Sequence, residues 1–223
     1  MDTELLGACY GVIAELLLNP RDRDAARIRC LEPALARAPA ALALAVQHFR
    51  ESPGAESIDE YTQTLELAPP CPLYLGAYLF DDPTSCRGVG ASGRNGYMIE
   101  LTNVYRHFGV QLSARELPDF LPLMVEFLAL SLRHPERDRI GLRRRFVEQQ
   151  VVPGLAPLEA ALARYQSPYA SLIAALGIAL CDDLARMGDT RPWAPPGGER
   201  LPRARRSLPV VTEDSPRRKE ARP

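Results

Sequence analysis

Three carboxylates in one short segment are the residues best placed to do chemistry. Glu116 and Asp119 belong to the run Glu116-Leu117-Pro118-Asp119-Phe120-Leu121-Pro122, and Glu126 follows in an apolar stretch. Paired carboxylates can act as general acid and base in hydrolysis. Hydrolysis also needs a nucleophile, an activated water or an oxyanion hole, and the neighbouring sequence offers none of these. We therefore interpret the three carboxylates as candidate binding residues.

The position of these carboxylates on a helix follows from a capping pattern. Ser113-Ala114-Arg115-Glu116 has the form of a capping box, which predicts a helix that begins there and carries Glu116 and Asp119 in its first turn. A carboxylate such as Glu126 within an apolar helix needs a cationic partner. The internal candidates are Arg94, Arg106 and Arg115, and an arginine on a bound peptide is the external candidate.

A glycine-rich stretch, 88–93, matches the Gly-x-Gly-x-x-Gly pattern of dinucleotide sites. In those sites the glycines follow a β-strand and open a helix that faces the pyrophosphate. Residues 82–86 do not resemble a strand, so the sequence favours a loop, with a mobile loop beside a binding groove as a second option.

A basic cluster consists of Arg143, Arg144 and Arg145 together with Arg133, Arg137 and Arg139. Such a cluster could contact phosphates. Acidic residues lie close enough in sequence to pair with it, and they are Glu136, Asp138 and Glu148. We therefore predict a solvated helix face.

Metal and redox chemistry are not indicated. The five cysteines include no Cys-x-x-Cys pair, and the three histidines lie far apart, so we expect reduced thiols, no bound metal and no cofactor. A net charge of -1 gives no general attraction for nucleic acid. The acidic start, 1–4, is unlike an export signal, and the apolar run 172–181 is too short to span a bilayer. We expect a cytoplasmic protein without membrane insertion.

Apolar residues recur at helical spacing almost throughout the chain, which predicts an all-α single-domain bundle of about eight to ten helices over residues 1–188. From residue 189 to 223, prolines and arginines predominate, and we predict a disordered basic tail in which Trp193 alone could dock on the domain. The helical segments are expected at 5–17, 25–38, 40–49, 57–67, 73–80, 94–108, 116–132, 142–152, 153–165 and 168–187.

Several of these segments together resemble the NarJ/TorD-type molybdoenzyme assembly chaperones, the nitrate reductase delta-subunit-like family. The run 116–122 followed by Glu126-Phe127-Leu128 is similar to the family's Glu-Leu-Pro-Asp signature, and 94–109 resembles the helix that precedes it. Segments 10–20, 61–66 and 72–80 are similar to the family's first helix, its Tyr-x-x-x-Phe-Asp stretch and the helix after that. The chain departs from the pattern at Phe120, where many members have histidine, and at Glu66, where aspartate is usual.

The resemblance implies a TorD/NarJ-like fold and a cytoplasmic chaperone without catalytic residues. Such a protein binds the N-terminal or leader segment of the apo catalytic subunit of a type II dimethyl sulfoxide reductase-family molybdoenzyme. It holds that client for molybdenum cofactor insertion, assembly and export. The client carries the cofactor, the client's identity stays open, and the chaperone is a monomer or a domain-swapped dimer.

For this chain we expect a groove in which the client's apolar face contacts apolar side chains and its arginines meet acidic ones. The alternative is a nucleotide-binding protein that uses the glycine-rich loop, or a regulatory adaptor that uses the basic tail. The candidate client-binding residues are Leu73, Tyr74, Tyr78, Phe80, Asp81, Asp82, Arg94, Met98, Leu101, Tyr105, Glu116, Leu117, Pro118, Asp119 and Phe120.

Overall fold

The computed structural model describes residues 1–67, 69–80, 93–112, 116–138 and 140–188, and helices dominate these ranges. Within them the only extended pairing is one antiparallel bridge between Tyr74 and Phe120. The predicted all-α class is therefore confirmed, while the predicted tail lies outside the described residues. The helices are α1 (Thr3–Leu16), α2 (Ala25–Leu31), α3 (Ala40–Glu51), α4 (Ile58–Tyr61), α5 (Gly76–Leu79), α6 (Gly93–His107), α7 (Leu121–Ser131), α8 (Leu142–Arg145), α9 (Val152–Arg164) and α10 (Tyr169–Met187).

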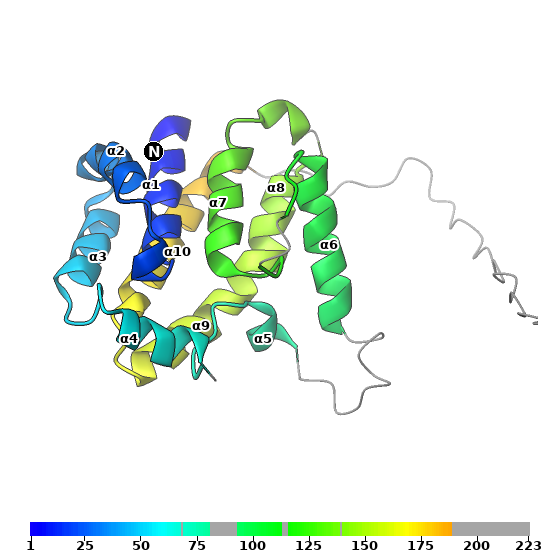
Figure 1. The fold of residues 1–223 in the computed structure, drawn as a ribbon. Coiled ribbons are helices and arrows are strands. Elements are labelled where there is room, and N and C mark those ends of the chain that lie inside the picture. The colour runs from blue at the N-terminus through cyan, green and yellow to red at the C-terminus, as the bar shows by residue number, and fades with distance from the viewer. Residues whose placement is uncertain (68, 81–92, 113–115, 139, 189–223) are drawn as a thin grey trace, which may run out of the picture. The chain divides into compact units, whose positions relative to one another are not determined.

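Helix α1 contributes much of the core. Its broad apolar stripe, which includes Leu6, Tyr10 and Ile13, has no exposed surface. The opposite side carries small residues and is buried too at Gly11 and Ala14. A helix that is buried on both sides needs neighbours on both sides. These neighbours include α7 and α10, and Figure 1 shows α7 beside α1.

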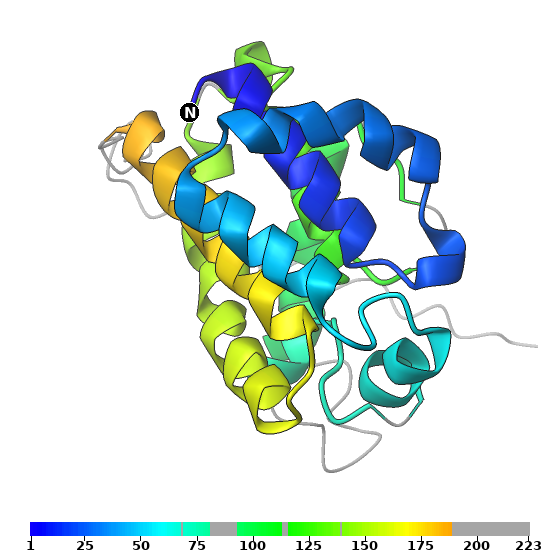
Figure 2. The same ribbon diagram turned by 90° about the vertical axis from the view of Figure 1, so that its left-hand side faces the viewer.

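The longest helix, α10, packs along α3, and the two lie side by side in Figure 2. An edge-to-face contact between Phe49 and Tyr169, with ring centroids 5.0 Å apart, joins these helices. Aromatic pairs of this geometry add stabilisation beyond the area that they bury.

A second aromatic cluster joins α6 to α7. Tyr105 on α6 contacts Phe127 on α7 with ring centroids 4.9 Å apart. Phe127 in turn contacts Phe146 at 4.8 Å, in the π-helical turn Phe146–Val151 that follows α8. Because these rings fix both ends of the connection between α6 and α7, they also fix where the acidic segment around Glu116 lies.

The predicted solvated basic face is wrong at Arg143. This residue is only 4% exposed, and its guanidinium forms an ion pair with the buried Asp183 of α10, with an Nη1–Oδ1 distance of 2.6 Å. Tyr10 of α1 donates a hydrogen bond to the same carboxylate at 2.7 Å. The other guanidinium N–H groups reach Ser131 Oγ and the Leu128 carbonyl. Arg143 lies on the same helical face as Phe146 and Val147, and this face turns inward.

Most predicted helix boundaries are confirmed, and the acidic segment gives the main correction. Ser57 Oγ accepts a hydrogen bond from Glu60 N, as a capping box requires, and Gly109, after the last turn of α6, has a left-handed φ of 81°. However, α7 begins at Leu121, so Glu116 and Asp119 precede the helix. Phe120 has extended backbone because it pairs with Tyr74, and this pairing delays the start of the helix.

Candidate functional site

The acidic segment is held in place by backbone pairing with residues 73–75. Leu75 N donates to Asp119 O at 3.0 Å, and Leu121 N donates to Leu73 O at 2.8 Å. The rings of Tyr74 and Phe120 stack in a tilted arrangement with centroids 5.3 Å apart. Two segments more than 40 residues apart in sequence therefore form one rigid support.

Asp119 is fully buried at the centre of this support. Its Oδ2 accepts a hydrogen bond from Gly76 N at 3.0 Å and lies 3.4 Å from Arg94 Nη2. Its Oδ1 has no hydrogen-bond partner among the described residues. Burial raises the pKa of Asp119, although the Arg94 guanidinium opposes this rise. Asp119 therefore holds the start of α5 in place and offers no surface to a bound chain.

Glu116 has the opposite environment, because its side chain is exposed. Tyr74 Oη donates a hydrogen bond to Glu116 Oε2 at 2.8 Å. Burial, together with this hydrogen bond, raises the pKa of Tyr74 to about 12, so the phenol stays protonated and remains a donor at neutral pH. The bond orients the Glu116 carboxylate while leaving it open to solvent.

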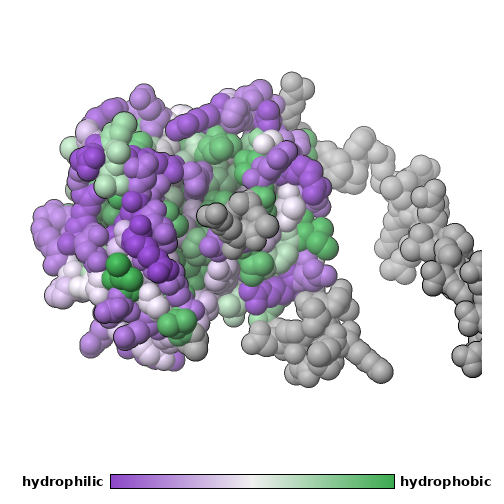
Figure 3. Space-filling model, viewed as in Figure 1, coloured by the Kyte–Doolittle hydropathy of each residue, from purple (hydrophilic) through white to green (hydrophobic). Residues whose placement is uncertain are grey.

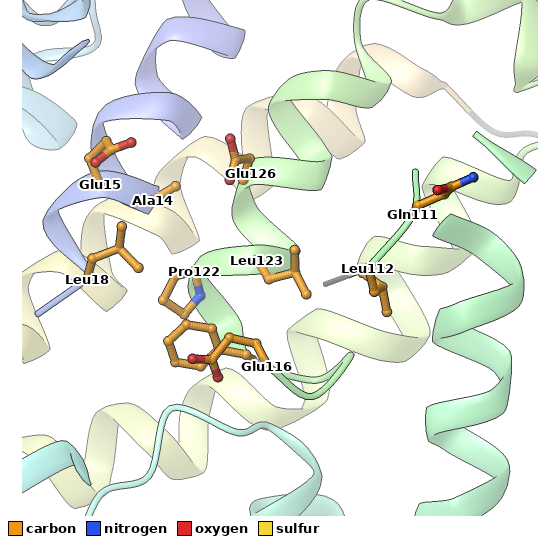
Figure 4. A pocket seen from close by; sticks show the side chains of 10 residues that line it. Ala14, Glu15, Leu18, Gln111, Leu112, Glu116, Pro122, Leu123 and Glu126 are labelled. Atoms are coloured by element: carbon orange, nitrogen blue, oxygen red, sulfur yellow. The ribbon is translucent and has the colours of Figure 1, made fainter. Parts of the chain in front are cut away.

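Glu116 belongs to a cleft of about 300 Å³ between α1, α7 and the segment before α7, which we call the acidic cleft. Three carboxylates and several apolar side chains face it, with Glu15 and Glu126 at one end and Glu116 at the other (Figure 4). Apolar surface is visible over α7 between hydrophilic margins in Figure 3. The cleft is lined by Ala14, Glu15, Leu18, Gln111, Leu112, Glu116, Phe120, Pro122, Leu123 and Glu126.

The partner of Glu126 is an arginine that the sequence did not indicate. Arg27 on α2 lies 2.9 Å from Glu126 Oε1 and 2.8 Å from Glu15 Oε1. Arg94 pairs with Asp119 instead, and Arg115 lies outside the described residues. Arg27 is 99 residues from Glu126 in sequence, and the packing of both α2 and α7 against α1 brings the pair together.

The predicted client-binding residues fall into five groups. Glu116 and Phe120 line the acidic cleft, whereas Leu73, Leu101, Tyr105 and Asp119 are buried and unavailable for contact in this conformation. Leu117 and Pro118 lie between cleft residues in sequence, and the half-buried Tyr74 contacts the cleft residues Glu116 and Phe120. Tyr78, Phe80, Arg94 and Met98 are half-buried on α5, α6 and the residue after α5, away from the cleft lining. Asp81 and Asp82 lie outside the described residues.

The contribution of α1 to the cleft was missed. Glu15 is a carboxylate within an apolar helix, which is the signal that singled out Glu126, and it could have been found in the same way. Ala14, Leu18, Leu112 and Leu123 carry no such signal, because an apolar residue at helical spacing reads as core.

Within the described residues, no three or more His, Cys, Asp or Glu side chains are grouped so that they could hold a metal ion. In the same ranges no helix has both the length and the apolar character needed to cross a bilayer. Nearly all of the glycine-rich stretch lies outside the described residues, which include only Gly93, at the start of α6.

The fold and the site together define a class of all-α protein. Its first helix forms one wall of an apolar cleft that has acidic residues at its edges. The sequence model of the family described as nitrate reductase delta subunit matches residues 29–175, so the chain belongs to that family. This confirms the family inferred from the motifs.

Two similar relatives both have the name nitrate reductase molybdenum cofactor assembly chaperone NarJ, one from Escherichia coli strain K12 and one from Escherichia coli O157:H7. Each is 40% identical to this chain over 76 residues, which are 34% of this chain and 28% of the relative. The matched stretch therefore covers little more than a quarter of each relative. Their name describes a chaperone and not a catalyst, in agreement with the expectation of a non-enzymatic protein.

Proposed function

We propose that this chain is a cytoplasmic assembly chaperone for a molybdoenzyme of the type II dimethyl sulfoxide reductase family. It binds the N-terminal or leader segment of the apo catalytic subunit and holds the subunit for molybdenum cofactor insertion, assembly and export. The chaperone itself needs no cofactor, because the client carries it. Membership of the nitrate reductase delta subunit family and the name of the two relatives support this proposal.

The observation that carries the proposal is the acidic cleft. Leu18 and Leu123 give it apolar walls, and Glu116 and Glu126 give it a negative rim. An amphipathic leader segment presents an apolar face and, in a twin-arginine leader, two guanidinium groups. The apolar face would supply most of the binding free energy, and the charge pairs would orient the segment and favour basic partners over acidic ones.

Glu116 is the acidic residue best prepared for a client arginine. Its carboxylate is exposed, so little desolvation opposes pairing, and Tyr74 already fixes its orientation. A fixed carboxylate loses less conformational entropy when a guanidinium binds than a mobile one would. Among the described residues, no observation favours the alternative of a nucleotide-binding or adaptor protein.

The proposal is tested by calorimetry with a synthetic peptide of about 20 residues that has the sequence of an N-terminal leader from a type II catalytic subunit. We expect one peptide per chain, and binding at least roughly tenfold weaker in Leu123→Gln, which makes an apolar wall polar. The matched control is Leu44→Gln, because Leu44 is 62% exposed on α3 and does not line the cleft. Absence of binding, or equal affinity in the two variants, would contradict the proposal.

A further inference from the structure

A second, larger cavity lies next to the acidic cleft along the same side of α1. This cavity, of about 860 Å³, is lined by the earlier turns of α1 and by α2. The lining residues Glu4, Ala8, Gly11 and Glu15 are spaced three or four apart, so they form one stripe along α1, and Leu18 continues the lining just after the helix ends. Helix α7 and the residues just after it line both cavities in the same way. Leu123 and Glu126 line the acidic cleft, and Ala129 and Arg133 line the larger cavity.

The side chain of Arg27 lies between the acidic cleft and the larger cavity. Arg27 lines the larger cavity and pairs with Glu15 and Glu126, which line the acidic cleft. We call this set of contacts the Arg27 bridge. The bridge spans from α2 to both α1 and α7, and it already places a guanidinium where the acidic cleft is most negative.

One of the two contacts of the Arg27 bridge is easily exchanged. The Arg27 side chain is 36% exposed and that of Glu126 is 49% exposed, and an ion pair between such accessible groups contributes little net stability. The Glu15 side chain is only 6% exposed and also accepts a hydrogen bond from Asp24 N, so its carboxylate stays in place and needs a cation beside it, whichever arginine supplies it. The element that carries Arg27 is also loosely attached. Neither α2 nor the 3-10 turn after it, Glu32–Arg37, contains a fully buried residue. Segments with little buried surface open at low free energy.

We propose that Arg27 occupies the place of a client arginine, and that an arginine of the bound segment displaces it from Glu15 and Glu126. Displacement joins the two cavities into one trough along α1 and α7. This inference rests on the proposed function, since it specifies how the same site receives its client. The exchange replaces one guanidinium by another, so the two carboxylates are never left together without a cation.

The length, the floor and the charges of the joined trough determine which kind of segment it can bind. The stripe from Glu4 to Leu18 is about 20 Å long, which corresponds to roughly four turns of helix. Gly7 and Ala8 form a low floor that lets a partner helix approach closely, and Gly11 lies under Leu31 of α2, which moves together with Arg27 in the proposed displacement. Arg37 and Arg133 outnumber Glu4 at the far end, so basic residues are favoured more strongly at the end of the segment that lies over the acidic cleft. The occupant is an amphipathic helix with arginine at one end.

The test uses a fluorescent synthetic amphipathic peptide of about 16 residues, with leucine on one face and two arginines at one end, and measures anisotropy. A second peptide carries citrulline, which keeps the shape of arginine without its charge. We expect Arg27→Ala to bind the arginine peptide roughly three- to tenfold more tightly than the wild type, because the competitor is gone. Affinity for the citrulline peptide should stay the same.

Arg29→Ala is the matched control, because Arg29 is an exposed arginine on the same helix that lines neither cavity. Glu126→Gln is the second variant, and we expect it to weaken binding of the arginine peptide only. In the double variant Arg27→Ala/Glu126→Gln, most of the gain from Arg27→Ala should be lost. Hydrogen exchange gives an independent measurement: amides in 25–31 should exchange faster when the arginine peptide is bound.

The outcomes separate the two proposals. Binding of the arginine peptide that Arg27→Ala leaves unchanged or weakens would overturn the displacement of Arg27 but not the proposed function. Slower exchange in 25–31 on binding would have the same meaning. Absence of binding by the wild type and by every variant would overturn both.

Discussion

Two carboxylates that lie three residues apart have opposite environments in this protein. Asp119 is sealed behind Gly76 and Arg94, whereas Glu116 is exposed and held by the Tyr74 hydroxyl. The sequence places both in a single acidic segment, and neither the residue type nor the spacing tells them apart. The backbone pairing of Tyr74 with Phe120 makes the difference, because it turns Asp119 inward and Glu116 outward.

Asp119→Ala should lower the free energy of unfolding by about 1–3 kcal/mol, because the amide of Gly76 loses its buried acceptor and Arg94 loses its partner. Urea denaturation measures this change. Glu116→Gln is the control, and its effect should stay within about 0.5 kcal/mol. A loss no larger than that of the control would mean that Asp119 does not hold the start of α5.

The pH dependence of stability follows from the same residue. Burial raises the pKa of Asp119, so the folded protein binds this proton more tightly than the unfolded chain does. The contribution of Asp119 to stability is therefore greatest below the unfolded-state pKa, and it declines as the pH rises from there through the folded-state pKa. Asp119→Asn, which cannot ionise, should remove this decline from the urea-derived stability profile.

At the scale of the helices, most of the fold could be predicted from the sequence, because it depends on local signals. The spacing of apolar residues predicts the helices, Ser57 predicts the start of α4, and Gly109 predicts the end of α6. The pairing of Arg27 with Glu126 and the burial of Arg143 could not be predicted, because each depends on which helices pack together and sequence spacing carries no such information. The start of α7 was misplaced because a local capping pattern competed with a long-range bridge.

The clearest prediction about the helices concerns the ion pair of Arg143 and Asp183. Arg143→Ala leaves a buried carboxylate without its cation and should cost about 3–5 kcal/mol in chemical denaturation. Tyr10→Phe removes only one hydrogen bond from the same carboxylate and should cost about 0.5–1.5 kcal/mol. Arg145→Ala, at a neighbouring exposed position, is the control. Equal small effects in all three variants would contradict the network.

At the scale of the whole molecule, the described residues of the acidic cleft and of the Arg27 bridge all lie between positions 14 and 126. The core that supports them extends to α10, which ends at Met187.

Deletion of 189–223 should therefore leave the affinity for the client peptide unchanged within about twofold, and the peptide should raise the thermal midpoint of the shortened chain as it does that of the full chain. Calorimetry and thermal denaturation of the two chains measure this. Loss of peptide binding on deletion would instead favour an adaptor that acts through its basic tail.

Helix α1 supplies both the centre of the core and one wall of the acidic cleft, and this double role limits how the protein can evolve. A change in α1 that suits a new client also disturbs packing against α7 and α10, so drift in this helix is costly. Adaptation to a different leader is more readily accommodated at Glu116, Leu123 and Arg27, which lie on other elements. Among related proteins that serve different enzymes, we expect these positions to vary together with the client's leader while the inner stripe of α1 stays constant.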